Sequence, residues 1–151
     1  MKKAELETVT LPDGNRFTGY KTELVFYSWQ NGFYHEQTEL EEFFLSRSDK
    51  MRCVYDIGAN LGNHSVYFAT HSKASVFSFE PVPMTFDLLK TNVEQNNLSE
   101  RVKLFPFALG AEESVTKMQV GGAGELAYSS IAGTNITTGY GTQEVPVKPA
   151  G

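Results

Sequence analysis

One short segment, VYDIGANLGNH at residues 54–64, constrains the fold of this chain more than any other. The apolar run at 53–57 is rich in β-branched and aromatic side chains, which predicts a buried strand. Gly58 and Gly62 follow, and the pattern then becomes helical. This order brings backbone N–H groups and a helix N-terminus up to a ligand, and glycine leaves room for the turn or for the ligand. The segment therefore predicts a ligand-binding βα unit in an α/β fold.

The glycine spacing indicates which ligand this turn accepts. A dinucleotide fingerprint reads G-x-G-x-x-G, whereas this chain has D-x-G-x-x-x-G with Asp56 at the strand end. An acidic group there suits a positively charged ligand better than a pyrophosphate. A second strand, VFSFEP at 76–81, ends on Glu80, which lies 18 residues after Gly62. That offset is close to the ~20 residues at which a carboxylate binds ribose hydroxyls.

Three segments carry a family resemblance: DIGANLGNHSVYFA, FSFEPVPMTFDLLKTNVEQNN and VKLFPFALG. Together they resemble the opening half of an FkbM-type methyltransferase, over about residues 34–147. The resemblance implies an α/β fold of the Rossmann-like class I methyltransferase type, with an incomplete parallel sheet preceded by a small N-terminal β region. It further implies S-adenosylmethionine as cofactor and a small hydroxylated or sugar-like molecule as methyl acceptor.

The resemblance also implies a cofactor site. Its S-adenosylmethionine-binding residues are Asp56, Gly58, Ala59, Asn60, Gly62, Asn63, His64, Glu80, Pro81, Phe107 and Ala108. Simpler roles remain open for several of them. Glu80 can be a solvent-exposed carboxylate, Phe107 a core residue, and Asn63 or Ser65 a helix cap. The serine pair at 129–130 resembles one often seen in the family and is expected at most to line the pocket.

Composition limits the other function classes. The formal net charge is −5 with no basic block, so the sequence does not indicate nucleic-acid binding. No apolar run approaches the ~18 residues of a membrane span, and no apolar region of a signal peptide follows the two N-terminal lysines. The single Cys53 is expected to be a small buried hydrophobe, and a cytoplasmic location fits this cysteine usage. No Cys, His and Asp cluster has metal-ligand spacing.

The chain divides at about residue 35. Residues 1–35 predict a β region, with a hairpin turn at Asp13 and Gly14 and a further strand at 23–29. Residues 36–151 predict the Rossmann-like part, which opens with a helix from an N-cap at Thr38 to Arg47. The later elements are expected as strands at 53–57, 75–79, 102–107, 114–120 and 144–148, helices at 63–71 and 83–96, and a flexible glycine stretch at 121–124. Alternating strands and helices predict parallel pairing.

No catalytic residue is assigned. Methyl transfer to a hydroxyl requires alignment and often a base, and His35, His64 and His71 are the only histidines. His64 lies near the loop, but a histidine at a helix start usually faces water. The aromatic N-terminal segment fits a packed β layer more simply than an acceptor surface.

The C-terminal end differs from the family pattern. In that family, a helix and a strand with an IK-[IL]-D-x-E-G type motif follow the position of VPVK, and this sequence has none. We expect a fragment with an exposed apolar edge on the strand at 53–57. Alternatively, a partner, such as a second copy in a homo-oligomer, or a rearranged element of the chain covers this edge. The alternative functions are a non-catalytic assembly module and, against the loop spacing, a dinucleotide-dependent oxidoreductase.

Overall fold

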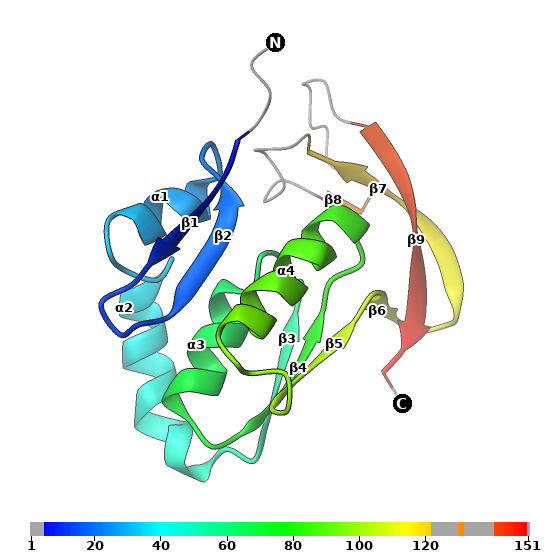
Figure 1. Cartoon of the computed structure of the whole chain (residues 1–151). Coiled ribbons are helices and arrows are strands. Elements are labelled where there is room, and N and C mark those ends of the chain that lie inside the picture. The colour runs from blue at the N-terminus through cyan, green and yellow to red at the C-terminus, as the bar shows by residue number, and fades with distance from the viewer. Residues whose placement is uncertain (1–4, 122–129, 132–140, 151) are drawn as a thin grey trace.

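Parallel strands form the centre of the computed structural model, which describes residues 5–121, 130–131 and 141–150 (Figure 1). Strands β3 (Cys53–Ile57), β4 (Ser75–Phe79) and β5 (Val102–Phe105) pair in the order β3-β4-β5. Helices α3 (Asn63–His71) and α4 (Pro83–Gln95) make the two crossovers. The predicted βαβαβ alternation is confirmed, although the last strand ends at Phe105 and not at 107.

The register aligns the carboxyl ends of the strands. Ile57 of β3 lies opposite Phe79 of β4, and Phe79 lies opposite Phe105 of β5. The loops after β3 and β4 therefore leave the sheet at the same edge, where ligands of open α/β sheets bind. This alignment places Gly58 and Glu80 at neighbouring strand ends.

Within the described residues β3 is an edge strand that pairs only with β4. Its Tyr55 and Ile57 are 60% and 65% exposed, so the expected apolar edge is present. Cys53 is exposed, so its predicted burial is wrong. The reason is that Cys53 shares one face of β3 with the exposed Tyr55 and Ile57, opposite the face that carries the buried Asp56.

The N-terminal hairpin forms as predicted. Strands β1 (Leu6–Thr10) and β2 (Arg16–Tyr20) pair in antiparallel fashion around the turn at Gly14, whose φ is 90°. Side-chain amides of α4 bind the free edge of β2: Asn92 receives the Thr18 N–H at 2.7 Å and donates to its carbonyl at 3.0 Å. The hairpin edge is thereby satisfied by side chains.

The predicted strand at 23–29 is wrong. These residues form helix α1 (Leu24–Gln30), and Val25, Phe26 and Trp29 are buried. Positions 25, 26 and 29 share one face of a helix, whereas on a strand 26 would point away from 25 and 29. Packing of this stripe outweighs the β propensity of the residue types.

The predicted helix from Thr38 to Arg47 is irregular. The structure has a short α2 (Gln37–Glu39), a π-helical turn η1 (Leu40–Phe44) and a 3-10 segment η2 (Leu45–Lys50). The N-cap is Glu36 and not Thr38, and its φ of 58° is left-handed. Leu40 and Phe44 are buried, whereas Phe43, in the same π-helical turn, is 70% exposed.

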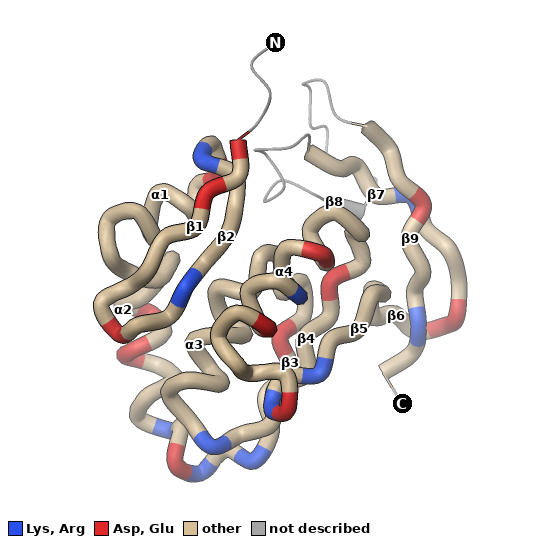
Figure 2. Tube along the Cα trace, in the orientation of Figure 1, with Lys and Arg blue, Asp and Glu red and all other residues tan. Residues whose placement is uncertain are grey.

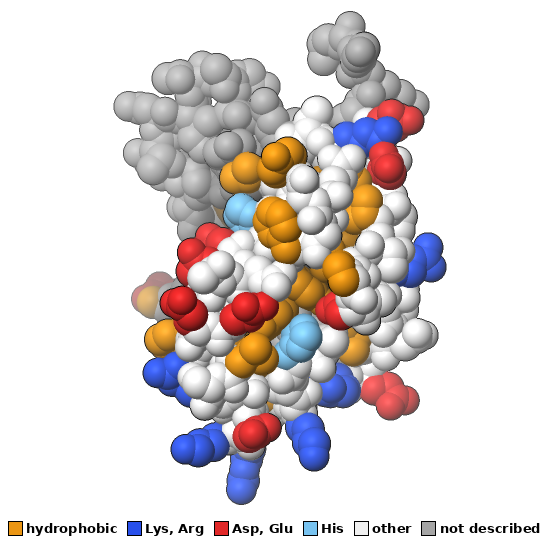
Figure 3. All heavy atoms as spheres, turned by 90° about the vertical axis from the view of Figure 1, so that its left-hand side faces the viewer, with side chains coloured by type: hydrophobic (Ala, Val, Ile, Leu, Met, Phe, Trp, Pro, Cys, Tyr) orange, Lys and Arg blue, Asp and Glu red, His pale blue; other side chains and the backbone are white. Residues whose placement is uncertain are grey.

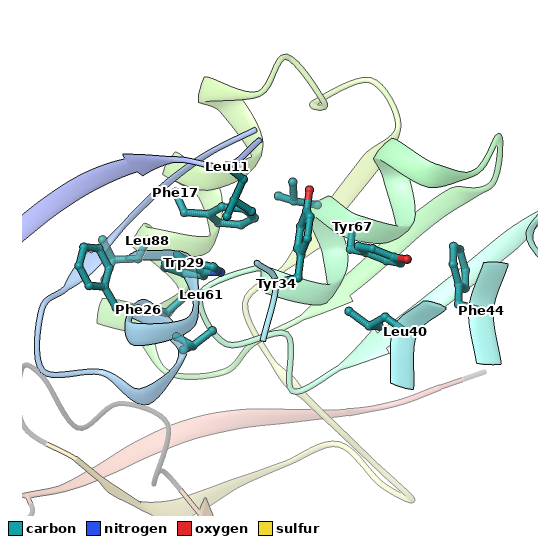
Figure 4. Close-up of a cluster of buried hydrophobic side chains, with 12 residues drawn as sticks. Leu11, Phe17, Phe26, Trp29, Tyr34, Leu40, Phe44, Leu61, Tyr67 and Leu88 are labelled. Carbon is teal, nitrogen blue, oxygen red and sulfur yellow. The ribbon is translucent and has the colours of Figure 1, made fainter. Parts of the chain in front are cut away.

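The main core joins this N-terminal layer to α3 (Figure 4). Phe17 stacks on Trp29 with ring centroids 4.4 Å apart, and Tyr34 meets Tyr67 edge-on at 4.9 Å. Most aromatic side chains of the N-terminal segment therefore pack in the core and do not form an acceptor surface. The layer they belong to contains helix α1 as well as the β1–β2 hairpin. A second cluster, which includes Ala69, Leu89 and Val102, fills the space between the sheet and its two helices.

The C-terminal strands form a separate, mostly antiparallel sheet. Its order is β6-β9-β7-β8, with β6 (Ala108–Gly110), β7 (Ser114–Val120), β8 (Ser130–Ile131) and β9 (Gly141–Pro149). The strands predicted at 114–120 and 144–148 are present, the latter extended. The predicted glycine stretch beyond 121, together with Ser129, lies outside the described residues, and only the backbone of Ser130 is described.

Charges of both signs are interspersed along the described chain (Figure 2). Lys21 illustrates the pattern, because its ammonium lies 2.7 Å from the Glu7 carboxylate and 3.3 Å from that of Glu5. Such exposed pairs contribute little to stability, because water and salt screen them. The folded state therefore depends mainly on the aromatic core.

Candidate functional site

The loop after β3 is fixed by hydrogen bonds to the end of β4. The N–H groups of Gly58 and Ala59 both donate to the Phe79 carbonyl, at 2.9 and 3.0 Å. The Asn60 N–H donates to Glu80 Oε2 at 3.0 Å. The sequence predicts that these N–H groups are available to a ligand, and this prediction is wrong. The N–H groups of Gly58, Ala59 and Asn60 already donate to the end of β4.

Glu80 is a buried carboxylate and not the exposed one of the simpler interpretation. It is 6% exposed, and its Oε1 accepts the Val82 N–H at 2.9 Å while Oε2 accepts the Asn60 N–H. Burial raises its pKa, and these two hydrogen bonds oppose the rise. Each oxygen keeps a further lone pair. Glu80 can thus hold the loop and still accept two ligand hydroxyls.

Asp56 points toward the start of α3. It is 7% exposed, and Ser65 Oγ donates to its Oδ2 at 2.5 Å; the Ser65 and Ser78 hydroxyls are 2.7 Å apart. Burial raises the pKa of Asp56, against the hydrogen bonds from Ser65 and the nearby His64. Its charge contributes to the raised pKa of Glu80, so the two carboxyl groups lie close enough to interact. Asp56 acts on this region through its charge and its hold on α3.

The raised pKa of Asp56 predicts a pH dependence of stability. The native state holds the proton more tightly than the unfolded state, so the free energy of unfolding falls as pH rises through the native pKa, above the ordinary 3.8. Asp56→Asn cannot ionise and should lose less stability over the same range. Urea unfolding between pH 4 and 8 measures this difference. The exposed Asp87→Asn is the control, and an equally steep profile for Asp56→Asn would contradict the assignment.

The two glycines of the loop differ in what surrounds them. Both have left-handed backbones, with φ of 78° at Gly58 and 89° at Gly62. A Cβ on Gly62 would lie 2.8 Å from Leu89 Cδ1, whereas one on Gly58 would meet nothing within 4 Å. Only Gly62 is required for close packing of α3 and α4.

Alanine substitution should separate these two roles. We expect Gly58→Ala to cost about 1 kcal/mol for the left-handed backbone alone. Gly62→Ala should cost roughly 2–4 kcal/mol because the overpacking against Leu89 adds to the same strain. Urea denaturation measures the free energy of unfolding of both variants. Equal losses would show that the left-handed backbone accounts for the cost and that the contact with Leu89 adds nothing.

Asn63 does not cap α3 but joins it to the N-terminal layer. Its Oδ1 accepts the indole N–H of Trp29 at 2.9 Å and the His35 N–H at 3.0 Å. Its amide nitrogen donates to the His35 carbonyl at 2.9 Å. The N-cap of α3 is Gly62, without a side-chain cap bond, and Ser65 binds Asp56 instead. Neither Asn63 nor Ser65 caps α3 with its side chain, so the helix-cap interpretation is wrong for both residues.

A hollow of about 240 Å³ lies against this loop. Its lining residues are Leu24, Val25, His35, Gly58, Ala59, Asn60, Leu61, Asn63 and His64. The structure thus brings five residues of the predicted site, Gly58, Ala59, Asn60, Asn63 and His64, to one hollow. Asp56 and Glu80 do not line it; they lie at the adjacent strand ends.

The remaining predicted residues lie along the same sheet edge. Pro81 is buried directly after Glu80. Phe107 and Ala108 do not end the third strand, since β5 stops at Phe105 and Ala108 begins β6. The Phe107 ring is half-buried, and its centroid lies 5.7 Å from that of the Phe79 ring. The Lys148 ammonium lies 5.1 Å from the Phe107 centroid. Its position fits core packing and leaves part of the ring accessible.

Sequence reasoning missed Asn92 as a part of the site's support. Asn92 is fully buried, and its amide nitrogen donates to the Leu61 carbonyl at 2.7 Å as well as to Thr18. One side chain therefore connects the hairpin, α4 and the loop. The available signal was an asparagine between Leu89 and Val93 on the apolar face of a helix, since a buried amide needs several partners.

The fold and these strand ends define the class of structure: this is the Rossmann-like fold of S-adenosylmethionine-dependent methyltransferases. TYW2 from Pyrococcus horikoshii, solved in complex with MeSAdo, aligns with a TM-score of 0.54 and 18% identity over 72% of this chain and 38% of that one. An S-adenosylmethionine-dependent methyltransferase from Agrobacterium tumefaciens aligns with a TM-score of 0.51 and 17% identity over 72% of this chain and 34% of that one.

Sequence comparison finds a methyltransferase relative. The chain is 31% identical over 80 residues to the hexuronic acid methyltransferase AglP of Haloferax volcanii. The aligned segment covers 53% of this chain and 31% of AglP. The chain spans about a third of the length of these relatives. No protein-family model matches it.

Proposed function

We propose that this chain is the cofactor-binding part of an S-adenosylmethionine-dependent methyltransferase, of the FkbM type that its motifs resemble. The observation that carries the proposal is the Glu80 carboxylate, buried at the end of β4 and hydrogen-bonded to the loop after β3. Glu80 would accept the two ribose hydroxyls with its remaining lone pairs, a bidentate charge-assisted contact.

The residues present fit this cofactor. The first turn of α3 has N–H groups without carbonyl partners inside the helix, which suits a carboxylate. The Asp56 and Glu80 carboxyl groups suit the positive sulfonium, and the exposed part of Phe107 would offer an aromatic edge to the adenine. When bound, S-adenosylmethionine supplies an activated methyl group. The chain's own residues hold and orient the cofactor, and alignment with the acceptor provides the main rate gain.

The acceptor class follows from the relative's name. Because AglP is a hexuronic acid methyltransferase, we propose O-methylation of a sugar-like hydroxyl, with a hexuronic acid as the first candidate. No helix within the described residues is long and apolar enough to cross a membrane. A cytoplasmic location stays a prediction from the sequence.

Isothermal calorimetry tests the cofactor. We expect S-adenosylhomocysteine and S-adenosylmethionine to bind and NAD not to bind, because Asp56 and the loop spacing disfavour a pyrophosphate. Binding of NAD in preference to both would reverse the proposal in favour of an oxidoreductase. Failure of all three to bind would remove the cofactor role.

A second candidate function is a non-catalytic assembly module. The exposed edge of β3, with Tyr55 and Ile57 largely accessible, favours it because an unpaired apolar strand edge can pair with another chain. Sedimentation over a range of concentrations tests it. A concentration-dependent dimer without cofactor binding supports the module, whereas a monomer that binds S-adenosylhomocysteine contradicts it.

A further inference from the structure

Two of the three histidines line one hollow beside the loop, where the sequence placed only His64. His35 and His64 line the 240 Å³ hollow, whereas His71 lies at the other end of α3 with its Nε2 3.7 Å from Asp13. Figure 3 looks onto the face of the N-terminal elements, where histidine side chains lie among hydrophobic ones. The lining residues of the hollow thus combine two imidazoles with apolar side chains next to the cofactor loop.

His35 is held in this hollow by contacts on both its backbone and its ring. The Asn63 side chain binds its N–H and its carbonyl, at 3.0 and 2.9 Å. Asn63 is itself 7% exposed and fixed by the Trp29 indole. On the ring, Nδ1 lies 3.1 Å from Ser28 Oγ, which leaves Nε2 for another partner. These three contacts fix both the backbone and the ring orientation of His35.

Asn60, which lines the hollow, and Glu36, which follows His35 in the chain, adopt left-handed backbones without being glycine. Glu36 has a φ of 58° and Asn60 a φ of 49°. At Glu36 this conformation accompanies a carboxylate 3.3 Å from His64 Nε2, a contact that lacks hydrogen-bond geometry. The His64 Nδ1 remains for a ligand. Such conformations cost of order 1 kcal/mol and concentrate at functional sites.

Asn60 supplies an unused acceptor. Its Oδ1 is buried and has no hydrogen-bond partner among the described residues. A buried amide oxygen without a partner costs free energy that a ligand hydroxyl recovers. The opposite wall is apolar, formed by Leu24, Val25 and Leu61.

We propose that this hollow binds the methyl acceptor as a single hexuronic acid ring, an inference that rests on the proposed methyltransferase function. A ring hydroxyl would donate to Asn60 Oδ1, the ring carboxylate would accept from the His35 and His64 imidazoles, and the C–H face would pack on the apolar wall. The volume is below the ~300–1,000 Å³ of sites for drug-sized ligands, which matches one sugar ring. The adjacency to Gly58–Leu61 brings the acceptor beside the proposed cofactor.

Histidine NMR tests the location. In protein saturated with S-adenosylhomocysteine and in protein without it, D-glucuronate is added at millimolar concentrations while the imidazole C–H resonances are followed. His→Gln variants at 35, 64 and 71 assign them. We expect saturable shifts of His35 and His64 and none of His71. Absence of shifts at His35 and His64, or equal shifts at all three histidines, would overturn the proposal.

The same titrations separate this proposal from the proposed function. Failure of S-adenosylhomocysteine to bind removes the cofactor role, while the glucuronate shifts are still read in the protein without it. If S-adenosylhomocysteine displaces glucuronate from His35 and His64, the hollow belongs to the cofactor and the acceptor assignment falls.

Asn60→Gly provides a variant that should remain folded. Glycine tolerates the left-handed backbone, keeps the N–H that binds Glu80, and removes only the side-chain oxygen. We expect glucuronate affinity to fall about five- to tenfold. Asn97→Gly is the matched control, because Asn97 has the same left-handed backbone, φ 58°, but lies exposed after α4. Unchanged glucuronate affinity in Asn60→Gly would contradict the role of its amide.

Discussion

Glu80→Ala should weaken S-adenosylhomocysteine binding by roughly 30-fold or more. The substitution removes both proposed ribose contacts, and loss of a bidentate contact of this kind costs about 2 kcal/mol. It also leaves the N–H groups of Asn60 and Val82 without their acceptor. The loop therefore loses its tie to β4, which adds to the effect. Calorimetry on the purified variant measures the affinity directly.

Two further variants interpret that loss. Glu94→Ala, on the exposed face of α4, should change the affinity much less, because the Glu94 carboxylate pairs with the Lys90 ammonium at 3.8 Å on the surface of that helix. Glu80→Gln keeps one amide oxygen and should fall between the two. Equal effects at positions 80 and 94 would count against the ribose role. If Glu80→Ala binds normally while its unfolding midpoint drops, Glu80 has a structural role alone.

Trp29→Ala should reduce the free energy of unfolding by about 3–5 kcal/mol. Trp29 is 1% exposed, stacks on Phe17 and donates its indole N–H to Asn63. Removal of the ring leaves a large cavity in the main core. Because Trp29 is the only tryptophan of the chain, urea unfolding should be followed by circular dichroism and not by fluorescence.

Graded substitutions separate the packing of Trp29 from its hydrogen bond. Trp29→Phe keeps most of the ring and leaves Asn63 one donor short, so we expect a loss of roughly 1–3 kcal/mol. Tyr27→Ala, on the exposed side of α1, should stay within about 0.5 kcal/mol of the wild type. A loss at Tyr27 as large as at Trp29 would mean that the helix propensity of α1, and not the core, determines stability.

The elements around the loop could be predicted because their signals are local. Strands at 53–57 and 75–79 and helices at 63–71 and 83–95 follow from periodicity, glycine and proline. The segment at 23–29 was assigned wrongly because its residue types favour a strand while its burial pattern is helical. The exposure of Cys53 depends on the neighbours of β3, and no local pattern reports those.

In the candidate site too, features set by local sequence could be predicted, whereas contacts between distant residues could not. The positions of Gly58, Gly62 and Glu80 follow from spacing in the sequence. The clamp of Asn63 on His35 and the link from Asn92 to Leu61 join residues far apart in the chain. Likewise, sequence alone gave no reason to expect that the strand end would take the N–H groups of Gly58 and Ala59.

Those bonds from the loop to β4 bear on how fast a ligand is exchanged. The chain's own hydrogen bonds anchor the loop through Phe79 and Glu80, so little conformational entropy should be lost from the loop when a ligand binds. Rigid docking of this kind leaves encounter rates nearly constant among related ligands. Differences in affinity should then appear as differences in residence time.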